Sequence, residues 1–113
     1  MLEDLKKIEF HDLPVKSLLL DFANNCIGLV VKDYDEIRQD YLEINLLFTS
    51  ISSFYFQNID QTAMSEIYNC ILKEDGQTNF IEFTMISSTP IISCVVSFHF
   101  KEVRLEYNAN MDW

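Results

Sequence analysis

The dipeptide His11-Asp12 is the first place in this chain where the residue types could do chemistry. A neutral imidazole beside a carboxylate is the usual ingredient of a general base or of a metal site. Neighbouring side chains in a strand point to opposite faces, so the two share a site only if the chain turns there, which Pro14 allows. We favour a structural role over catalysis, in which Asp12 bonds to turn amides and His11 packs or caps.

The three cysteines are the next candidates, because a thiolate is both a nucleophile and a metal ligand. Cys26, Cys70 and Cys94 are an odd number, lie far apart and include no Cys-x-x-Cys pair. This spacing fits neither a disulfide framework nor a zinc site, and burial in an apolar run raises the pKa of a thiol. Neither Gly28 nor Gly76 has the setting of an oxyanion hole or of a phosphate-binding loop. We therefore expect reduced, packed cysteines, with no catalytic residue, no metal and no cofactor.

Five carboxylates lie close together in the sequence: Asp33, Asp35, Glu36, Asp40 and Glu43. A Ca²⁺ loop of twelve residues would need a central glycine and a terminal glutamate, which are missing here. A charge run of this kind is most often a solvated surface segment. Among functional interpretations, we rank highest a negative patch that steers a basic protein partner, because surface charge raises association rates and selects partners.

The charge of the whole chain excludes one class of partner. Lys and Arg number 8 against 18 Asp and Glu, which gives a formal net charge of −10 at pH 7. A nucleic-acid binder needs a clustered basic face that displaces counterions from phosphates. We therefore expect no nucleic-acid partner.

Tyr55 and Phe80 are further candidates among the aromatic residues, which make up 13% of the chain. They lie in segments 53–56 and 79–81, where large apolar side chains fall on both faces of an expected strand. Either a second layer or a partner protein must cover such faces. Together with the five carboxylates, they are the expected partner-binding residues, in a homodimer or in a complex with another protein. His99, in contrast, is expected on a solvated outer face.

The elements that position these residues fit in a single domain, 1–113, with termini that are expected to fray. Hydrophobic residues make up 49% of the chain, which is enough for a packed core. The opening residues lack the apolar run of a secretory signal, and no apolar stretch approaches the ~20 residues that cross a bilayer. We expect a cytoplasmic protein that does not enter a membrane.

Apolar residues recur at every second position along much of the chain, which is typical of half-buried strands. The stripe over 42–48 is the clearest. Runs over 15–22 and 26–32 predict a hairpin that turns near Asn24-Asn25. The polar segment 33–40 is expected to be an exposed loop or a single helical turn.

The second half of the chain continues this pattern. An Asp-Gly turn at Asp75-Gly76 favours a strand over 67–72, although a short helix expected near 60–66 could instead run on into it. A stripe over 92–100 changes phase before Val103, which predicts a bulge or tight turn near Lys101-Glu102. The result is a mainly β domain of seven to nine short strands at roughly ten-residue spacing, an antiparallel sandwich or barrel.

The opening of the chain also resembles a group of known proteins. Residues 8–12 read Ile-Glu-Phe-His-Asp, and aliphatic runs follow over 15–22 and 27–31, with a later strand that ends at 46–48. Over about its first half, the chain resembles small bacterial domains that begin with an FHD or LHD signature, some of which look like immunity proteins of polymorphic toxin systems. The resemblance implies a non-enzymatic inhibitor that binds a toxin domain, with an acidic surface where the toxin is basic. His11 and Asp12 match the signature, but the resemblance assigns them no defined role.

Three functions are compatible with these features. The leading hypothesis is an acidic protein-binding module, of the kind that an immunity-type inhibitor of a basic toxin would be. The second is a structural, homo-oligomeric β-domain without a dedicated ligand. The third is a small hydrolase or metal-binding protein that uses His11 and Asp12, or the carboxylates of 33–40.

Overall fold

The computed structural model describes residues 2–37, 39–57, 66–88 and 91–108. These residues form eight strands and one short helix, in the order α1 (Leu2–Lys6), β1 (Val15–Asp21), β2 (Cys26–Asp35), β3 (Asp40–Thr49), β4 (Ser52–Gln57), β5 (Glu66–Asp75), β6 (Thr78–Ser88), β7 (Ile91–Phe100) and β8 (Glu102–Asn108). The strand pairs are antiparallel. The mainly β fold that the alternating stripes predict is confirmed.

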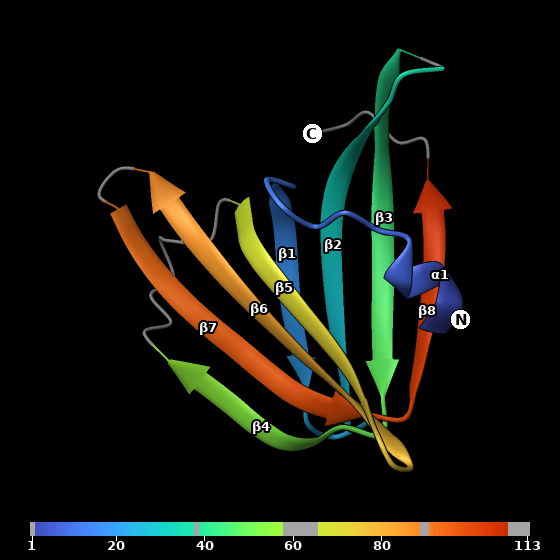
Figure 1. Cartoon of the computed structure of the whole chain (residues 1–113), viewed down its shortest axis with the longest axis vertical. Coiled ribbons are helices and arrows are strands. Elements are labelled where there is room, and N and C mark those ends of the chain that lie inside the picture. Colours follow the sequence, from blue (N-terminus) through green and yellow to red (C-terminus); the bar gives the residue numbers. More distant parts are fainter. Residues whose placement is uncertain (1, 38, 58–65, 89–90, 109–113) are drawn as a thin grey trace.

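The strands form two sheets of four. Sheet 1 has the order β1-β2-β3-β8, and sheet 2 has the order β4-β7-β6-β5. Figure 1 shows that the sheets meet at the bottom of the view and diverge toward the top, like the arms of a V. Two sheets that pack face to face make a β-sandwich, one of the two architectures that the sequence left open.

The predicted stripes face the interior between the sheets. Phe48 from sheet 1 is fully buried, and its ring lies 5.1 Å from that of Phe98 and 4.9 Å from that of Phe100 in sheet 2, measured between centroids. These contacts tie the two sheets together where they meet. Among the strand residues whose burial the structure describes, the other fully inaccessible ones are Ile27, Leu29, Val31, Ile67, Ile81, Met85 and Val96.

The chain passes from one sheet to the other at the same corner twice, between β3 and β4 and between β7 and β8. In sheet 1, Thr49 at the end of β3 pairs with Glu102 at the start of β8. In sheet 2, Ser52 at the start of β4 pairs with His99 near the end of β7. Between these pairs, the backbone N–H of Lys101 donates to the carbonyl of Thr49 over 3.1 Å. The pairing therefore continues around the corner from one sheet to the other.

The sharp bend at this corner has a local cause. Ser50 and Ser53 adopt positive φ angles of 55° and 53°, and the pairing of β4 with β7 shifts between Ser52 and Tyr55. A bulge of this kind bends a strand and increases its twist. The change of phase that the sequence predicts near Lys101-Glu102 is the matching bend in the other strand.

The N-terminal segment, residues 7–14, crosses the gap between the sheets on the side that faces the viewer in Figure 1. It leaves α1, which lies against β8, and leads to β1. Leu5 of α1 is buried in the hydrophobic core. Pro14, at the far end, forms an isolated antiparallel bridge with Glu66 of β5. The segment thus connects the edge of sheet 2 with the start of sheet 1.

The structure differs from the sequence-based predictions in the segment 33–40 and at α1. The expected loop over 33–40 is strand at residues 33–35 and 40, because β2 continues to Asp35, which pairs with Asp40, and is a turn at residues 36, 37 and 39. Polar residues are tolerated there because this end of the hairpin extends beyond the other strands. Helix α1 was not predicted, since five residues are too short to display a helical period. The helix expected near 60–66 lies outside the described residues, apart from Glu66, which begins β5.

Candidate protein-binding site

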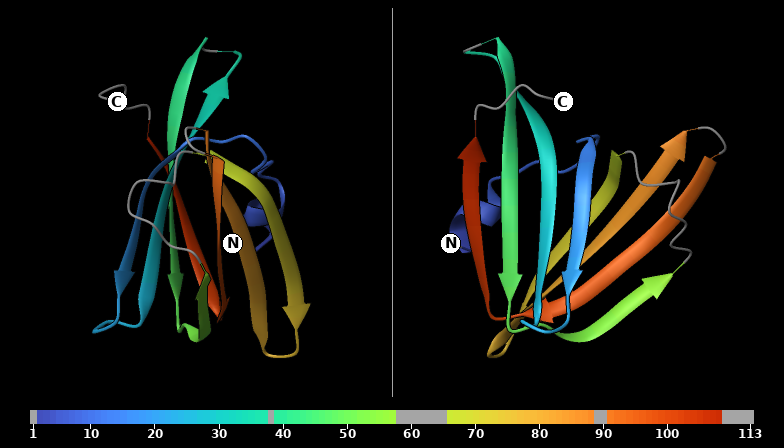
Figure 2. Two further views of the ribbon diagram at one scale, coloured as in Figure 1. Left: turned by 90° about the vertical axis from the view of Figure 1, so that its left-hand side faces the viewer. Right: turned by 180° about the vertical axis from the view of Figure 1, so that it is seen from behind.

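The outer end of the β2–β3 hairpin projects past the other strands in every view of Figures 1 and 2. We call residues 33–37 and 39–41 the hairpin tip. Tyr34 pairs with Tyr41 across the two strands, and their rings pack edge to face with centroids 5.1 Å apart. The ammonium group of Lys32 lies 4.5 Å from the centroid of the Tyr41 ring. Cross-strand aromatic pairs and cation–π contacts of this kind stabilise a two-stranded projection.

Four of the predicted carboxylates lie on the hairpin tip. The Asp35 carboxylate accepts a hydrogen bond from the backbone N–H of Ile37 at 3.0 Å, and the Asp40 carboxylate accepts one from that of Tyr41 at 2.8 Å. The bond to Ile37 fixes the start of the turn, and both bonds leave the negative charges at the surface. Asp33 and Asp35 are half-buried, whereas Glu36 and Asp40 are exposed.

Apolar surface accompanies these charges. Ile37, in the turn, is 95% exposed, and the paired rings of Tyr34 and Tyr41 are about half exposed. An exposed isoleucine contributes no core packing, and tyrosine is enriched at protein–protein interfaces. The hairpin tip therefore combines the negative charge and the apolar contact area that a protein interface uses.

Glu43, the fifth predicted carboxylate, does not belong to this surface. Its side chain is only 9% exposed, and its Oε1 lies 2.8 Å from Nζ of Lys16. The Glu43 charge is therefore compensated inside the protein. The sequence placed it with the acidic run because charge alone does not distinguish a paired carboxylate from a solvated one.

Tyr55 and Phe80 lie elsewhere, on the outer face of sheet 2. Tyr55 is opposite Ser97 and Phe80 is opposite His99, so the two aromatic rings lie on the same face of sheet 2. Neither ring belongs to the hairpin tip. Tyr55 is half exposed, while Phe80 is partly covered by the His99 ring at 5.2 Å. His99 is on the predicted face but is not solvated: its side chain is 24% exposed, and its Nδ1 is buried without a hydrogen-bond partner in the described part of the chain.

His11 and Asp12 are in contact with each other. Nδ1 of His11 lies 3.0 Å from Oδ2 of Asp12, and both side chains are mostly exposed. The His11 ring also packs on Tyr68, with centroids 5.8 Å apart. The predicted bonds from turn amides to the Asp12 carboxylate are replaced by this contact. The structural role of Asp12 comes instead from its backbone N–H, which donates to the carbonyl of Ile67 over 2.7 Å.

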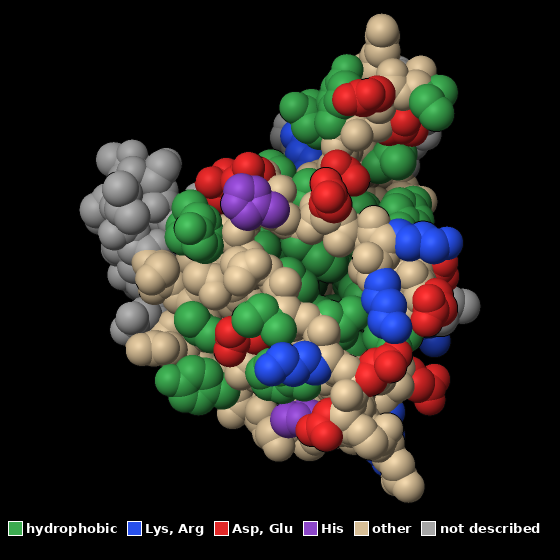
Figure 3. Space-filling view, viewed as in Figure 1, with side chains coloured by type: hydrophobic (Ala, Val, Ile, Leu, Met, Phe, Trp, Pro, Cys, Tyr) green, Lys and Arg blue, Asp and Glu red, His purple; other side chains and the backbone are tan. Residues whose placement is uncertain are grey.

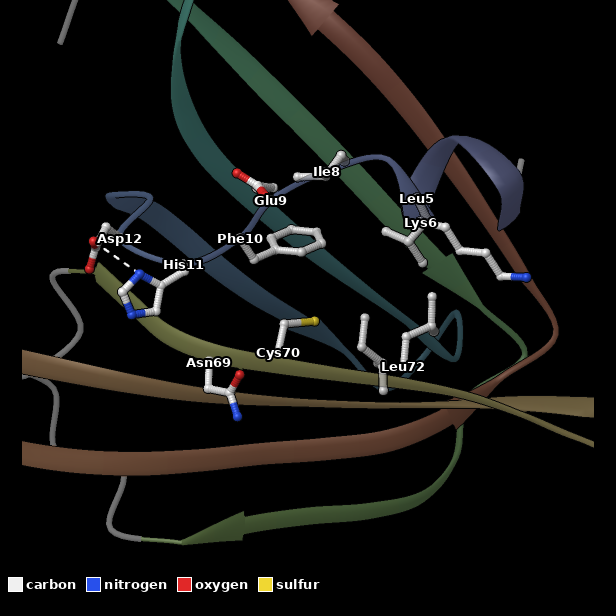
Figure 4. A pocket seen from close by; sticks show the side chains of 11 residues that line it. Leu5, Lys6, Ile8, Glu9, Phe10, His11, Asp12, Asn69, Cys70 and Leu72 are labelled. Atoms are coloured by element: carbon white, nitrogen blue, oxygen red, sulfur yellow. Dashed lines mark ion pairs between the residues drawn. The ribbon is translucent and has the colours of Figure 1, made fainter.

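A groove of about 760 Å³ separates the N-terminal segment from β5. Figure 3 shows it as a hollow in the middle of this face, with hydrophobic side chains at its bottom and charged side chains around it. In Figure 4, Phe10 and Cys70 line its interior, the His11–Asp12 pair lies at one end and Lys6 lies at the other. The ammonium of Lys6 reaches Oε1 of Glu74 in β5 over 2.9 Å. The groove is thus bridged at both ends.

Cys70 is the nucleophilic side chain that shares this groove with His11. Burial raises the pKa of its thiol to about 12. The thiol is therefore protonated near pH 7, whereas a reactive cysteine requires a lowered pKa. This environment supports the prediction that Cys70 is a packing residue.

The raised pKa predicts how stability depends on pH. The pKa of the Cys70 thiol is about 12 in the folded chain against a reference value of 9.0. Between these two values the unfolded state releases the proton first, so the free energy of unfolding falls as pH rises. Urea unfolding at pH values from about 8 to 11 should show this loss for the wild type relative to Cys70→Ala, which lacks the thiol. A stability difference that stays constant over this range would contradict the raised pKa.

Sequence reasoning missed Tyr34 and Ile37 because they lie in the segment 33–40, which the sequence predicts to be a loop. It missed Tyr41 because this residue directly follows that segment and has no partner without the hairpin. A signal was present, since the two tyrosines are placed symmetrically about the turn and would pair in a hairpin. It also missed the groove, because nothing in the sequence indicates that the N-terminal segment faces β5.

Among the described residues, no group of three or more His, Cys, Asp or Glu side chains could hold a metal ion. The helix found in that part of the chain is too short to cross a membrane. Comparisons with protein-family models, with curated proteins and with solved structures found no match for this chain.

Proposed function

We propose that this protein is a non-enzymatic binding module that recognises a basic surface of another protein, as an immunity-type inhibitor of a basic toxin would. The observation that carries the proposal is the hairpin tip. Its carboxylates stand on a projection beside Ile37, an isoleucine that is 95% exposed. Within the protein this side chain has no packing role, whereas a partner that covered it would gain from its burial.

The two components of the tip have different physical roles in such a complex. A net charge of −10 accelerates the encounter with a basic protein and penalises acidic partners. Apolar burial then supplies affinity, and covering one isoleucine contributes about 1.5–3 kcal/mol. Direct pairing of the tips of two copies is unfavourable, because it would bring like charges together.

The charge component is tested by neutralising Glu36 and Asp40 together, as Glu36→Gln and Asp40→Asn. We expect at least about a tenfold weaker Kd, mainly through slower association, because rim charges act on the encounter rate. Calorimetry and stopped-flow kinetics with the protein products of neighbouring genes measure both quantities. The matched control neutralises Glu102 and Glu106, two exposed carboxylates of β8, and should change binding far less.

Ile37→Ser provides an independent variant, because this side chain lies outside the core. Its thermal unfolding should match that of the wild type, while its complex should dissociate faster. The proposal is rejected if none of the neighbouring gene products binds. It is equally rejected if the β8 control weakens binding as much as the tip variants do.

A further inference from the structure

We propose that the groove between the N-terminal segment and β5 binds an extended segment of a partner protein as an added antiparallel strand. The site is separate from the hairpin tip. It rests on the pairing pattern of β5, on the walls of the groove and on the way the N-terminal segment leaves this edge.

The hairpin turn between β5 and β6 fixes which main-chain groups of β5 are free. Asp75 pairs with Thr78 across a two-residue loop, and the first loop residue, Gly76, has a positive φ of 64°. In such a hairpin the flanking pair exchanges both hydrogen bonds, and bonded and non-bonded pairs then alternate along the strands. Alternate residues of β5 therefore direct their N–H and C=O groups away from β6 and toward the groove: Glu74, Leu72 and Cys70.

The bonds made by Ile67 confirm this direction. Its carbonyl accepts from Asp12 at 2.7 Å and its N–H donates to the carbonyl of Leu13 at 2.9 Å, so this edge of β5 already binds extended backbone. One bulged residue, Tyr68, separates Ile67 from the rest of the edge. In the described part of the chain, the N-terminal segment makes no further backbone bond to β5.

Asp12 explains why the pairing stops. Its φ of 70° lies in the left-handed region, which turns the chain away from an extended path. The segment therefore leaves the edge of β5 after two hydrogen bonds and opens the groove beside it. Antiparallel pairing is the form this edge already uses, as the bridge between Pro14 and Glu66 shows.

The walls of the groove suit the side chains of such a strand. Phe10 and Leu5 line one side and Cys70 and Leu72 the other, so side chains that point inward meet an apolar surface. Its volume of about 760 Å³ lies within the usual range of ligand pockets. From Ile67 to Glu74 the edge spans roughly 23 Å at about 3.3 Å per residue, which limits the added strand to a short segment.

Charge selects the class of segment. The Asp12 carboxylate stands at one end of the groove, and the protein as a whole carries a net charge of −10. A strand with apolar residues at alternate positions and basic residues between them fits this site. Its backbone pairs with β5, its apolar side chains contact the walls of the groove, and its basic side chains complement the negative charge of the protein. A second copy of this chain would satisfy the backbone but would bring two strongly acidic proteins together.

The test uses acetyl-Lys-Val-Lys-Val-Lys-Val-Lys-amide as the probe and the full-length, ¹⁵N-labelled protein. We expect saturable shifts of the amide resonances of Cys70, Leu72 and Glu74, and at least about tenfold slower hydrogen exchange at these amides. In an antiparallel pair, the probe residues that exchange hydrogen bonds with Cys70 and Leu72 point their side chains to the same face as Cys70 and Leu72. That face is the apolar groove, so these probe residues are the valines. Methylation of the backbone nitrogens of the valines should therefore abolish binding. Methylation of the backbone nitrogens of the lysines, which leaves the side-chain charge unchanged, should preserve it.

Variants of the protein test the same edge from the other side. Leu72→Pro and Leu72→Ala remove the same packing, but only the proline removes the groove-facing N–H, a loss that edge strands tolerate. Binding should be lost in Leu72→Pro and retained in Leu72→Ala, with Glu74→Pro and Glu74→Ala as a second pair if Leu72→Pro does not fold. Equal binding within each pair, indifference to N-methylation, or shifts confined to the hairpin tip would overturn the proposal. So would an absence of shifts, or shifts that follow self-association of the protein.

Discussion

Replacing Phe48 with Ala is expected to lower the free energy of unfolding by about 3–5 kcal/mol, a large part of the stability of a domain this size. Phe48 is fully buried and lies against three rings, those of Phe83, Phe98 and Phe100. Truncation leaves a cavity where the sheets meet, and the corner beside it restricts how far they can close on it. Urea unfolding followed by circular dichroism measures the loss.

Phe22→Ala is the matched control, since it removes the same side chain at a position that is 75% exposed. The Phe22 ring contacts only the edge of the core, through Phe54 at 5.7 Å. Its removal should therefore cost much less than that of Phe48. Similar losses in the two variants would mean that the contact between the sheets does not dominate stability.

Lys16→Met is expected to produce the second large effect, a loss of about 2–3 kcal/mol. Removing one partner of a buried ion pair typically costs about 3–5 kcal/mol, and we expect less here because the Lys16 side chain is 39% exposed. The cost arises because the Glu43 carboxylate, only 9% exposed, is left without the ammonium at 2.8 Å. Equilibrium unfolding at neutral pH measures it.

The double variant Lys16→Met with Glu43→Leu separates this cause from lost packing. If the uncompensated carboxylate causes the damage, the second substitution should restore much of the stability, because a hydrophobic pair of similar size often replaces an ion pair without loss. Additive losses would instead indicate independent roles. Lys6→Met, which breaks the exposed pair with Glu74, should leave stability nearly unchanged.

The sequence was sufficient for the sheets because burial alternates wherever a strand has one face in the core. The stripe over 27–31 is buried as predicted, the stripe over 42–48 is buried from Ile44 onward, and the Asp75-Gly76 turn joins β5 to β6. The prediction from sequence failed where a strand leaves the core. Asp33 and Asp35 lie in β2, but they are polar residues of a kind that usually indicates a loop. A periodic pattern reports burial, and it reports strand structure only where the two coincide.

The functional surfaces were less accessible to sequence reasoning, because they depend on distance in space. Glu43 is adjacent in sequence to the acidic run but is neutralised by Lys16, 27 residues away. The groove arises between the first residues of the chain and β5, which the sequence does not relate. Even the His11-Asp12 dipeptide, whose residue types suggest chemistry, acts through a backbone bond and a φ angle that those residue types do not specify.

The shared corner at Ser50 and Lys101 couples errors of strand register in one sheet to errors of strand register in the other. Because β3 continues into β4 and β7 into β8, the alignment of strands in one sheet dictates the alignment in the other. A slip by one residue on either side would turn Phe48, Phe98 and Phe100 toward water in a single step. A wrong register in one sheet is therefore accompanied by a wrong register in the other, and the bend at the corner fixes the strand register of both sheets.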